Sequence, residues 1–578
     1  MGLESVKKIL MNENLYLKIF KILIKKIIKI FLLAGMIFTS GAISFAAVIK
    51  QQVNFAPNNI STWIWNTGVF NQDLRTNNTP GFEWPRGSNK FALFTSGLSI
   101  GAYVNGQLRM ANASYNGEYC PGYVLDSAGI ALYKTDARFK IYSIKYNSNR
   151  YNNPDYSKWK DVIQYGAPFN DINNNKIYDD GIDEPGMPDA DQTVFVCITD
   201  ADPSNHTTSE GFSGGTRPLY AEVHLTAWSY QYANMNDIQF FKWDVINKSG
   251  ASWDKTYFSI VTDPDLGDAS NDYIGCDTTL QLSYCYNATN QDGNGSSRTY
   301  GTNPPAVGQL FLRGAHIKNS HGNDTLNMTS SCYFTGTGSG GIVCEQDPSS
   351  NPIQAYNYMK GIKKDGTPWV VPYTEPPQIT KFCYSGDPET GAGWTEYSGM
   401  VKNCGGTLYG QTDPSPPGDR RYIFSSGSDM LTVNHLDTQK IVIAQLIARG
   451  NSNKNSVTKL KGLASFTRSV FYQFIEGNET YYTVPSPIIP TKYALYQNFP
   501  NPFNPVTTIK YEMKKLWHVK IQVYDMKGEL ISTLVNEDKP QGSYEIKFDA
   551  SNLPSGIYFV KMVSGGGFED SKKMVVIK

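Results

Sequence analysis

The stretch Ala221-Glu-Val-His-Leu-Thr-Ala227 alternates small or apolar residues with polar ones. Successive side chains of a β-strand point to opposite faces, so the odd-numbered residues share one face and Glu222, His224 and Thr226 share the other. This period of two predicts an antiparallel sheet with one covered face, and a β-sandwich closes such a face most simply. The stretch therefore assigns the chain to the mainly β class, as a multi-domain antiparallel β-sandwich.

Other strand-like runs surround this stretch, separated by clusters of Asn, Gly and Pro. Residues 238–246 and 256–261 are predicted to form a hairpin around residues 247–250. Asn105-Gly106 predicts a second hairpin, because both central residues of a type I′ turn need positive φ. The apolar run 439–448 predicts a buried strand.

One helix is predicted near the C-terminal end of this β region. Ser456 is a favoured N-cap, and Gly477 follows as a C-terminal stop. Between them, apolar residues recur at helical spacing, and this stripe is expected to cover the end of a sheet. The stripe consists of Val457, Leu460, Leu463, Phe466, Val470 and Phe474.

The composition limits the class of protein. Lys plus Arg and Asp plus Glu number 52 each, so no bulk charge attracts nucleic acid and no such partner is expected. Charged residues make up 18% of the chain, below the ~25% typical of soluble proteins. Aromatic residues make up 13%, which excludes a disordered chain.

The length of 578 residues predicts several domains of roughly 100–200 residues each. Composition and motifs divide the chain into six predicted segments. They are 1–46, a signal peptide; 47–216, a β-rich N-terminal cargo region; 217–352, a β-sandwich region; 353–480, a mixed region of loop, strand and helix that completes the cargo; 481–492, a Pro-rich linker; and 493–578, a small C-terminal β domain.

The first segment has the order of a secretory signal peptide. Five lysines between residues 18 and 29 precede the apolar run 30–38, and small residues follow up to a cleavage site after Ala46. Met11 is an alternative start, because the charged region is long. An uncleaved anchor over residues 27–47 is the competing interpretation, since about 21 residues can span a bilayer.

Eight cysteines occur, and none lies in a C-x-x-C motif. An even number in an exported chain favours disulfides. Buried free thiols are the alternative. Loop length favours the pairs Cys276/Cys285, Cys332/Cys344, Cys383/Cys404 and, by remainder, Cys120/Cys197.

The C-terminal segment carries four ordered motifs: Asn498-Phe-Pro-Asn-Pro-Phe-Asn-Pro505, Val523-Tyr-Asp-Met-Lys-Gly-Glu-Leu530, Leu553-Pro-Ser-Gly-Ile-Tyr558 and Lys572-Lys573. The prolines of the first motif are expected to fix an extended first strand, and Lys527-Gly528 to turn a hairpin. The strand-like runs, about six or seven of them, predict a small Ig-like sandwich.

These motifs resemble the type A C-terminal sorting domain of the type IX secretion system of Bacteroidetes-like bacteria. The resemblance implies export from the periplasm through the outer membrane to the cell surface or the extracellular space. It implies the type IX translocon and its sorting peptidase as partners, with attachment to a surface glycan or lipopolysaccharide as one fate of the product. The sorting signal would comprise Pro500, Asn501, Pro502, Phe503, Asn504, Pro505, Gly528, Gly556, Tyr558, Lys572 and Lys573.

The cargo itself resembles uncharacterised surface proteins that carry the same tail, on residues 262–277 and 418–422. That resemblance implies no activity.

The first candidate metal site lies between residues 171 and 184. Oxygen-bearing residues at alternate positions let a loop wrap around one Ca²⁺ ion, as in an EF-hand. Lys176 stands where such loops carry Gly, and Ile182 stands where they carry Glu, so Asp183 or Glu184 must reach in. An Asx-turn loop without metal is the alternative. The expected ligands are Asp171, Asn173, Asn175, the carbonyl of Ile177, Asp179 and Asp183.

A second acidic loop follows residue 262. Clustered carboxylates repel one another unless water or a cation neutralises them, so this loop is a second candidate for Ca²⁺. A pair of its acids could also serve a glycosidase if about 5–9.5 Å separated them across a cleft. The expected metal ligands are Asp263, Asp265, Asp268 and Asp272, with Asp277 nearby.

No catalytic motif nominates a nucleophile or a base among the six histidines, and His224 is expected to be a satisfied surface or interface residue. Aromatic faces that stack on sugar rings are a further lead, although core packing explains most aromatics in a β protein. The candidates are Trp63, Trp65, Trp84, Trp228, Trp243, Trp369 and Trp394.

The sequence thus favours a non-catalytic structural or adhesive β protein at the cell surface. An extracellular hydrolase acting on polysaccharide or protein is the first alternative, and a glycan-binding protein is the second. Whether the chain is an enzyme stays open at this point.

Overall fold

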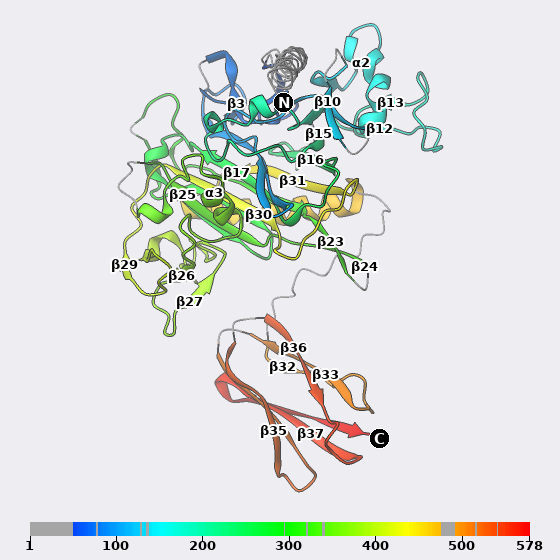
Figure 1. Cartoon of the computed structure of the whole chain (residues 1–578). Helices are drawn as coiled ribbons and strands as arrows, with labels where there is room; N and C mark the ends of the chain where they lie inside the picture. Colours follow the sequence, from blue (N-terminus) through cyan, green and yellow to red (C-terminus); the bar gives the residue numbers. More distant parts are fainter. Residues whose placement is uncertain are drawn as a thin grey trace, which may run out of the picture. The chain divides into compact units, whose positions relative to one another are not determined.

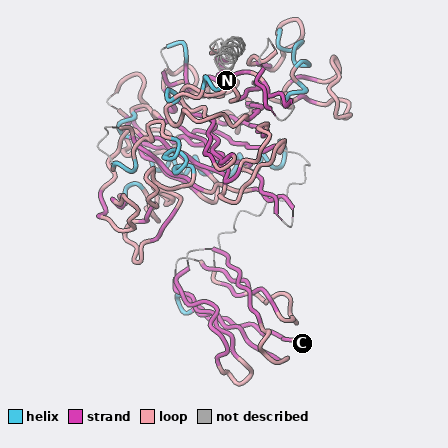
Figure 2. The backbone as a smooth tube through the Cα atoms, in the orientation of Figure 1, coloured by secondary structure: helices cyan, strands magenta, loops and turns pink. Residues whose placement is uncertain are grey.

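The computed structural model describes residues 50–76, 79–127, 130–134, 138–293, 295–319, 322–337, 342–475, 492–514, 517–539 and 542–578. The predicted signal peptide with its alternative anchor, Gly477, and the linker up to residue 491 lie outside these ranges. Strands dominate the described backbone (Figure 2). No helix in the described ranges is long and apolar enough to cross a membrane.

The larger sheet of the cargo is antiparallel, and β31 lies beside β16 near its middle (Figure 1). The central strand β31 carries apolar residues at successive positions, so its side chains can be buried on both faces of the sheet. In spatial order the nine strands are β11 (Tyr142–Lys145), β14 (Gln192–Thr199), β15 (Ala221–Ser229), β16 (Ile238–Asn247), β31 (Thr438–Ala448), β22 (Ala306–Arg313), β19 (Leu282–Asn287) and β18 (Asp272–Asp277), with β8 (Cys120–Pro121) also paired to β14.

The smaller sheet is also antiparallel and draws on equally distant parts of the chain. In spatial order its six strands are β25 (Ser330–Thr335), β30 (Arg420–Gly427), β17 (Asp254–Pro264), β6 (Phe91–Val104) and β5 (Phe82–Glu83), with β7 (Gln107–Ala111) also paired to β6. All three predicted cargo regions contribute strands to the two sheets.

The main hydrophobic core is shared by side chains from both sheets, which confirms the β-sandwich. The predicted face of β15, from Ala221 to Ala227, belongs to this core together with Ile260 of β17 and Phe424 of β30. β31 shows the alternation most clearly. Its residues Ile441 and Ile443 enter the main core, whereas Val442, Ala444 and Leu446 belong to a second core on the other face.

That second core is covered by α4 (Asn453–Val470), which buries Val457, Leu460 and Ala464 against the larger sheet. The predicted helix is therefore confirmed, but it covers a face of the sheet rather than its end. Its N-cap is Ser452, whose hydroxyl accepts a hydrogen bond from the backbone N–H of Asn455 at 3.1 Å. The prediction of Ser456 was one turn late, because residues 453–455 are polar and carry no apolar period.

A π-helical turn, Phe471–Ile475, continues α4, and two shorter helices, α2 (Pro154–Lys158) and α3 (Pro352–Met359), lie elsewhere in the cargo. Eight separate two-stranded sheets also occur in the described ranges of the cargo. They pair β1 (Gln52–Phe55) with β2 (Thr62–Trp65), β3 (Gln72–Asp73) with β4 (Thr79–Pro80), β9 (Tyr123–Ser127) with β10 (Ile130–Lys134), β12 (Phe169–Asn170) with β13 (Glu184–Pro185), β20 (Gln291–Asp292) with β21 (Gly301–Thr302), β23 (His316–Asn319) with β24 (Gly322–Thr325), β26 (Trp369–Val371) with β27 (Gln378–Thr380), and β28 (Met400–Lys402) with β29 (Gln411–Asp413).

The two predicted hairpins have different outcomes. Asn105 and Gly106 have φ of 51° and 75°, and they join β6 to β7 as expected for a type I′ turn. The hairpin predicted from β16 and β17 is wrong. β16 pairs with β15 and β31 in the larger sheet, whereas β17 pairs with β6 and β30 in the smaller one, so residues 248–253 cross between the sheets.

The cysteine pairs predicted from loop length are also wrong. Cys344 is joined to Cys404 across a separation of 60 residues. The other six cysteines are buried thiols. Loop length favours the nearest partner, but the fold brings the segments around Cys344 and Cys404 together and holds Cys332 and Cys383 in the core.

The C-terminal domain is a seven-stranded Ig-like sandwich, as predicted. Alternate residues such as Val519, Ile521 and Val560 fill its own core, with neighbours exposed between them. One sheet orders β32 (Ala494–Leu495), β33 (Val506–Met513) and β36 (Gly542–Asp549), and the other orders β35 (Leu530–Lys539), β34 (Trp517–Tyr524), β37 (Gly556–Ser564) and β38 (Phe568–Val576).

Candidate functional site

The loop between β12 and β13 gathers the first set of predicted metal ligands. The carboxylate of Asp183 accepts the backbone N–H of Ile172 at 2.9 Å and that of Asp179 at 2.7 Å, which closes the loop at its base. The side-chain amides of Asn173 and Asn175 each donate to Oδ2 of Asp179 at 2.7 Å. These two hydrogen bonds lower the pKa of Asp179.

Backbone hydrogen bonds to Asp171 shape the first half of this loop. The carboxylate of Asp171 accepts the backbone N–H groups of Asn175 at 3.1 Å and Lys176 at 2.6 Å. Lys176 has φ of 65°, the left-handed conformation that Gly supplies in a Ca²⁺ loop. The side chain of Ile177, by contrast, is 65% exposed.

The second acidic loop divides into separate groups. Asp263 and Asp265 lie at the end of β17 and meet Asp419, which precedes the neighbouring strand β30; carboxylate oxygens of the three residues lie within 4.8 Å of one another. Asp268 instead accepts the backbone N–H of Ser270 at 3.1 Å. Asp272 accepts the backbone N–H of Leu266 at 3.2 Å.

Asp419 was not predicted as part of this group, because it lies more than 150 residues from Asp263 along the chain. Arg421 also faces this group: its guanidinium lies 3.3 Å from Asp263 and 2.5 Å from Asp419. Burial raises the pKa of Asp263 to about 7, and burial together with Asp263 raises that of Asp265 to about 8. Asp419 also lines a cavity of about 430 Å³, together with Tyr333, Glu345, Lys402, Asp413 and Arg420.

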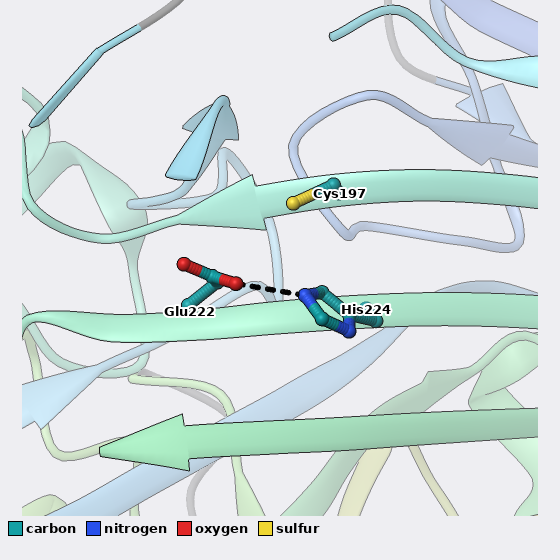
Figure 3. Close-up of side chains that lie close together, drawn as sticks. All are labelled: Cys197, Glu222 and His224. Atoms are coloured by element: carbon teal, nitrogen blue, oxygen red, sulfur yellow. Dashed lines mark hydrogen bonds and ion pairs between the residues drawn. The ribbon is translucent and has the colours of Figure 1, made fainter. Parts of the chain in front are cut away.

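A third cluster lies on the polar face of β15, where the sequence analysis proposed no site. Cys197 of β14 is directly opposite His224 of β15, and Glu222 lies two residues from His224 on the same face (Figure 3). One ligand atom of each residue lies within 4.8 Å of the others. A ring nitrogen of His224 is 2.9 Å from a carboxylate oxygen of Glu222.

All three residues are buried, so His224 is a satisfied interior residue rather than a surface one. The thiol of Cys197 donates to the carbonyl of Gly122 at 3.1 Å, and burial raises the pKa of this thiol. Burial alone would raise the pKa of Glu222, but the hydrogen bond and charge of His224 lower it. The signal that could have found this cluster is the Glu-x-His pair on a strand whose two faces are both covered.

The tryptophans proposed as sugar platforms belong mainly to the interior. Trp65, Trp228, Trp243 and Trp369 are at most 2% exposed, and Trp84 and Trp394 are at most 9% exposed. Trp63 is partly exposed, but the guanidinium of Arg75 covers its ring at 4.0 Å. Core packing therefore accounts for these side chains.

In the C-terminal domain, the first motif folds against the last strand. The side-chain amide of Asn501 donates to the carbonyl of Lys573 at 3.0 Å, and its oxygen accepts the N–H of Val575 at 2.8 Å. Phe503 is buried and exchanges backbone hydrogen bonds with Val575 and Ile577 at 3.0 Å. Residues 498–505 thus form a clasp on β38, and the predicted extended strand at the prolines is wrong.

The remaining motifs occupy the positions expected of them. Gly528, with φ of 83°, turns the chain between β34 and β35. Gly556 begins β37, and the hydroxyl of the buried Tyr558 donates to the carbonyl of Pro554 at 3.0 Å. Lys573 is exposed on β38, and Lys572 pairs with Asp570 at 3.0 Å.

Among solved structures, a polysaccharide lyase matches with 6% identity over 92% of this chain and 47% of its own, at a TM-score of 0.15. Dimeric latent PorU from Porphyromonas gingivalis matches with 10% identity over 67% of this chain and 31% of its own, at a TM-score of 0.13. The chain thus spans less than half the length of either protein, and likenesses this weak carry no argument. No curated protein matched the chain.

The C-terminal domain gives a specific match. Residues 497–578 fit the family model described as the secretion system C-terminal sorting domain, which includes the clasp and all four motifs. These residues are therefore a sorting domain of the type IX secretion system, and they mark the chain for export across the outer membrane to the cell surface or the extracellular space.

Proposed function

We propose that the exported protein is a non-catalytic adhesive or structural protein, and that the loop of residues 171–183 is a contact site ordered by Ca²⁺. The observation that carries this proposal is the division of the loop into an inner and an outer set of side chains. The polar residues at alternate positions face one another, whereas Ile172, Ile177 and Ile182 are 56%, 65% and 55% exposed.

The inner set supplies the oxygen atoms that Ca²⁺ requires, which are six to eight at about 2.3–2.6 Å. Asp171, Asp179 and Asp183 bring three carboxylates into the loop. A half-turn of the amide groups of Asn173 and Asn175 would present their oxygens, in place of their nitrogens, to the point they share with Asp179. The ion would then replace two amide hydrogen bonds with stronger ionic contacts.

The outer set offers an apolar surface. Isolated exposed apolar residues are common, but a group of them on one small lobe indicates an interaction site. Tyr146 and Tyr151, which are 70% and 93% exposed, precede the loop in sequence. Arg150 lies 3.8 Å from Asp180 and so links their segment to the loop. Burial of such side chains against a partner yields about 25 cal/mol per Å².

The test combines calorimetric Ca²⁺ titration, thermal melting and attachment of cells that display the protein. Asp171→Asn with Asp179→Asn should abolish Ca²⁺-dependent stabilisation and attachment, because it removes two of the three charges. Ile177→Asp should keep Ca²⁺ binding but lower attachment. Asp189→Asn, at an exposed carboxylate outside the loop, is the matched control. Unchanged melting of the wild type after chelation, or attachment that survives Ile177→Asp, would contradict the proposal.

An extracellular hydrolase is the second candidate function, and the cavity beside Asp419 favours it. Carboxyl groups that stay protonated near neutral pH are suited to general acid catalysis, and the raised pKa values of Asp263 and Asp265 meet that condition. A screen of polysaccharide and peptide substrates with the wild type and Asp419→Asn separates the two functions. Turnover that this substitution abolishes in a folded protein would overturn the non-catalytic proposal.

A further inference from the structure

We propose that Cys197, Glu222 and His224 bind a zinc ion that links strands β14 and β15 on the face of the larger sheet away from the main core. A thiolate, an imidazole and a carboxylate are the three ligand types that zinc takes from proteins. Their ligand atoms already lie within 4.8 Å of one another. Zinc bonds of about 2.0–2.3 Å place neighbouring ligand atoms about 3.5 Å apart, so small side-chain rotations would complete the site.

The direction of each side chain supports one shared centre. Figure 3 shows the sulfur of Cys197 on the same side of β15 as the facing atoms of Glu222 and His224. Nε2 of His224 is the nitrogen that faces Glu222. A Cβ atom at Gly166 would lie only 2.4 Å from Nδ1, so the backbone of Gly166 closes the other side of the ring and fixes its orientation. The imidazole is therefore already held with Nε2 toward the carboxylate.

Charge favours a divalent ion at this point. Glu222 is buried, and its nearest full positive charge is Lys248, 3.9 Å from a carboxylate oxygen. Burial of a charge is costly unless it is paired, and a metal ion would bring a positive charge closer to Glu222 than Lys248 does. A zinc ion would release the proton of the Cys197 thiol, and the thiolate and carboxylate together would then cancel the two charges of the ion. The ion and its two charged ligands therefore carry no net charge among themselves.

The ligand set selects zinc over calcium. Calcium needs six or more oxygen ligands, whereas sulfur and nitrogen ligands suit zinc. The backbone around the cluster is also arranged as support: the N–H of Val124 donates to the second carboxylate oxygen of Glu222 at 3.1 Å. Such outer contacts orient metal ligands.

A structural zinc ion fits the site better than a catalytic zinc ion does, and better than a catalytic role for the Cys197 thiol without metal. Cys197 is 2% exposed, and the rings of Phe139 and Trp159 belong to the same core cluster, so a substrate has no path to the sulfur. A fourth zinc ligand could come from one water or from the carbonyl of Gly122, which lies 3.1 Å from the sulfur. The ion would then join β14 to β15 beneath the packed side chains of residues 139–167.

The test uses the full mature chain, prepared with zinc and dialysed against a weak chelator. Mass spectrometry should find one zinc per chain, and replacement by Co²⁺ should give the near-ultraviolet charge-transfer band of a cobalt–thiolate bond. Cys197→Ser should remove both signals. Glu222→Gln and His224→Gln should reduce zinc occupancy and shift the thermal melt of the zinc-loaded protein down toward that of the metal-free wild type.

Cys332→Ser is the matched control. Cys332 is equally buried, and its thiol donates to the carbonyl of Tyr358 at 3.3 Å, but this thiol is outside the Cys197, Glu222 and His224 group. This variant should keep the zinc and the cobalt band. The proposal fails if the wild type shows neither signal, if folded Cys197→Ser retains both, or if peptide mapping finds Cys197 in a disulfide with Cys120. If Cys197→Ser does not fold, the two conservative variants and the wild-type cobalt band decide.

Discussion

Removal of the disulfide between Cys344 and Cys404 should cost the protein about 4 kcal/mol of folding free energy. The bond closes a loop of 60 residues, and the chain entropy that such a loop removes from the unfolded state corresponds to this value at 25 °C. The native contacts nearby should survive the change. Lys363 is buried there and donates to the side-chain oxygen of Asn403 at 2.7 Å, and it lies 2.5 Å from Glu345.

The double variant Cys344→Ser with Cys404→Ser provides the measurement. Urea unfolding should show a lower midpoint in the variant, and the oxidised wild type should fall to the same midpoint after reduction. The variant itself should not respond to the reductant. Cys276→Ser, at a buried thiol outside the disulfide, serves as the control for cavity effects. A loss below about 1 kcal/mol would refute the entropy argument, and a peptide map that links Cys332 to Cys344 would refute the pairing itself.

Three further predictions concern pH, the loop and the tail. Folding stability should fall as pH rises from about 4 to about 8, because the folded state keeps protons on Asp263 (pKa about 7) and Asp265 (pKa about 8) that the unfolded chain releases near the ordinary aspartate pKa of 3.8. Half of the shift in the pKa of Asp265 corresponds to about 3 kcal/mol of folding free energy. Asp265→Asn should therefore reduce the fall in the free energy of unfolding that urea titrations measure across this pH range. An unchanged slope of stability against pH would contradict the assignment. Lys176→Gly should stabilise the protein by about 0.5–1 kcal/mol and tighten Ca²⁺ binding, because it relieves a left-handed φ; calorimetry that shows weaker binding would count against the loop as a Ca²⁺ site. Deletion of residues 493–578 should leave the protein in the periplasm, and Asn501→Ala, which frees the clasp from β38, should lower surface delivery, as cell fractionation would show; full surface delivery of the deletion variant would refute the role of the tail.

Local patterns in the sequence were sufficient to identify many elements. β15 and β31 were predicted well, because their sequences indicate which strand faces are buried. β15 shows this through the alternation in residues 221–227, and β31 through the apolar run that ends at Ala448. Asn105-Gly106 specified its turn through backbone sterics alone. The N-cap of α4 could not be placed as well, because Ser452 and Ser456 are both suitable residues and only tertiary contacts distinguish them.

Strand pairing and side-chain clusters that join distant segments could not be predicted from these local patterns. A short polar connection looks the same whether it turns a hairpin or crosses between sheets, as residues 248–253 do. The loop of residues 171–183 could be proposed as a metal site because its polar residues recur at alternate positions within one short stretch. By contrast, Asp419 reaches Asp263 through strand pairing, and Cys197 reaches His224 in the same way, so no spacing in the sequence relates the two members of either pair.

The position of β31 has a consequence for the order in which the chain can fold. β31 lies between β16 and β22, and β30 lies between β17 and β25, although both inserted strands follow their neighbours in sequence. The smaller sheet cannot be completed until residue 427 is available, and the larger sheet cannot be completed until residue 448 is available. A chain truncated before residue 420 lacks β30 and β31, the strands that join the two parts of each sheet. The completeness of both sheets therefore depends on the segment of the cargo that is nearest in sequence to the sorting domain.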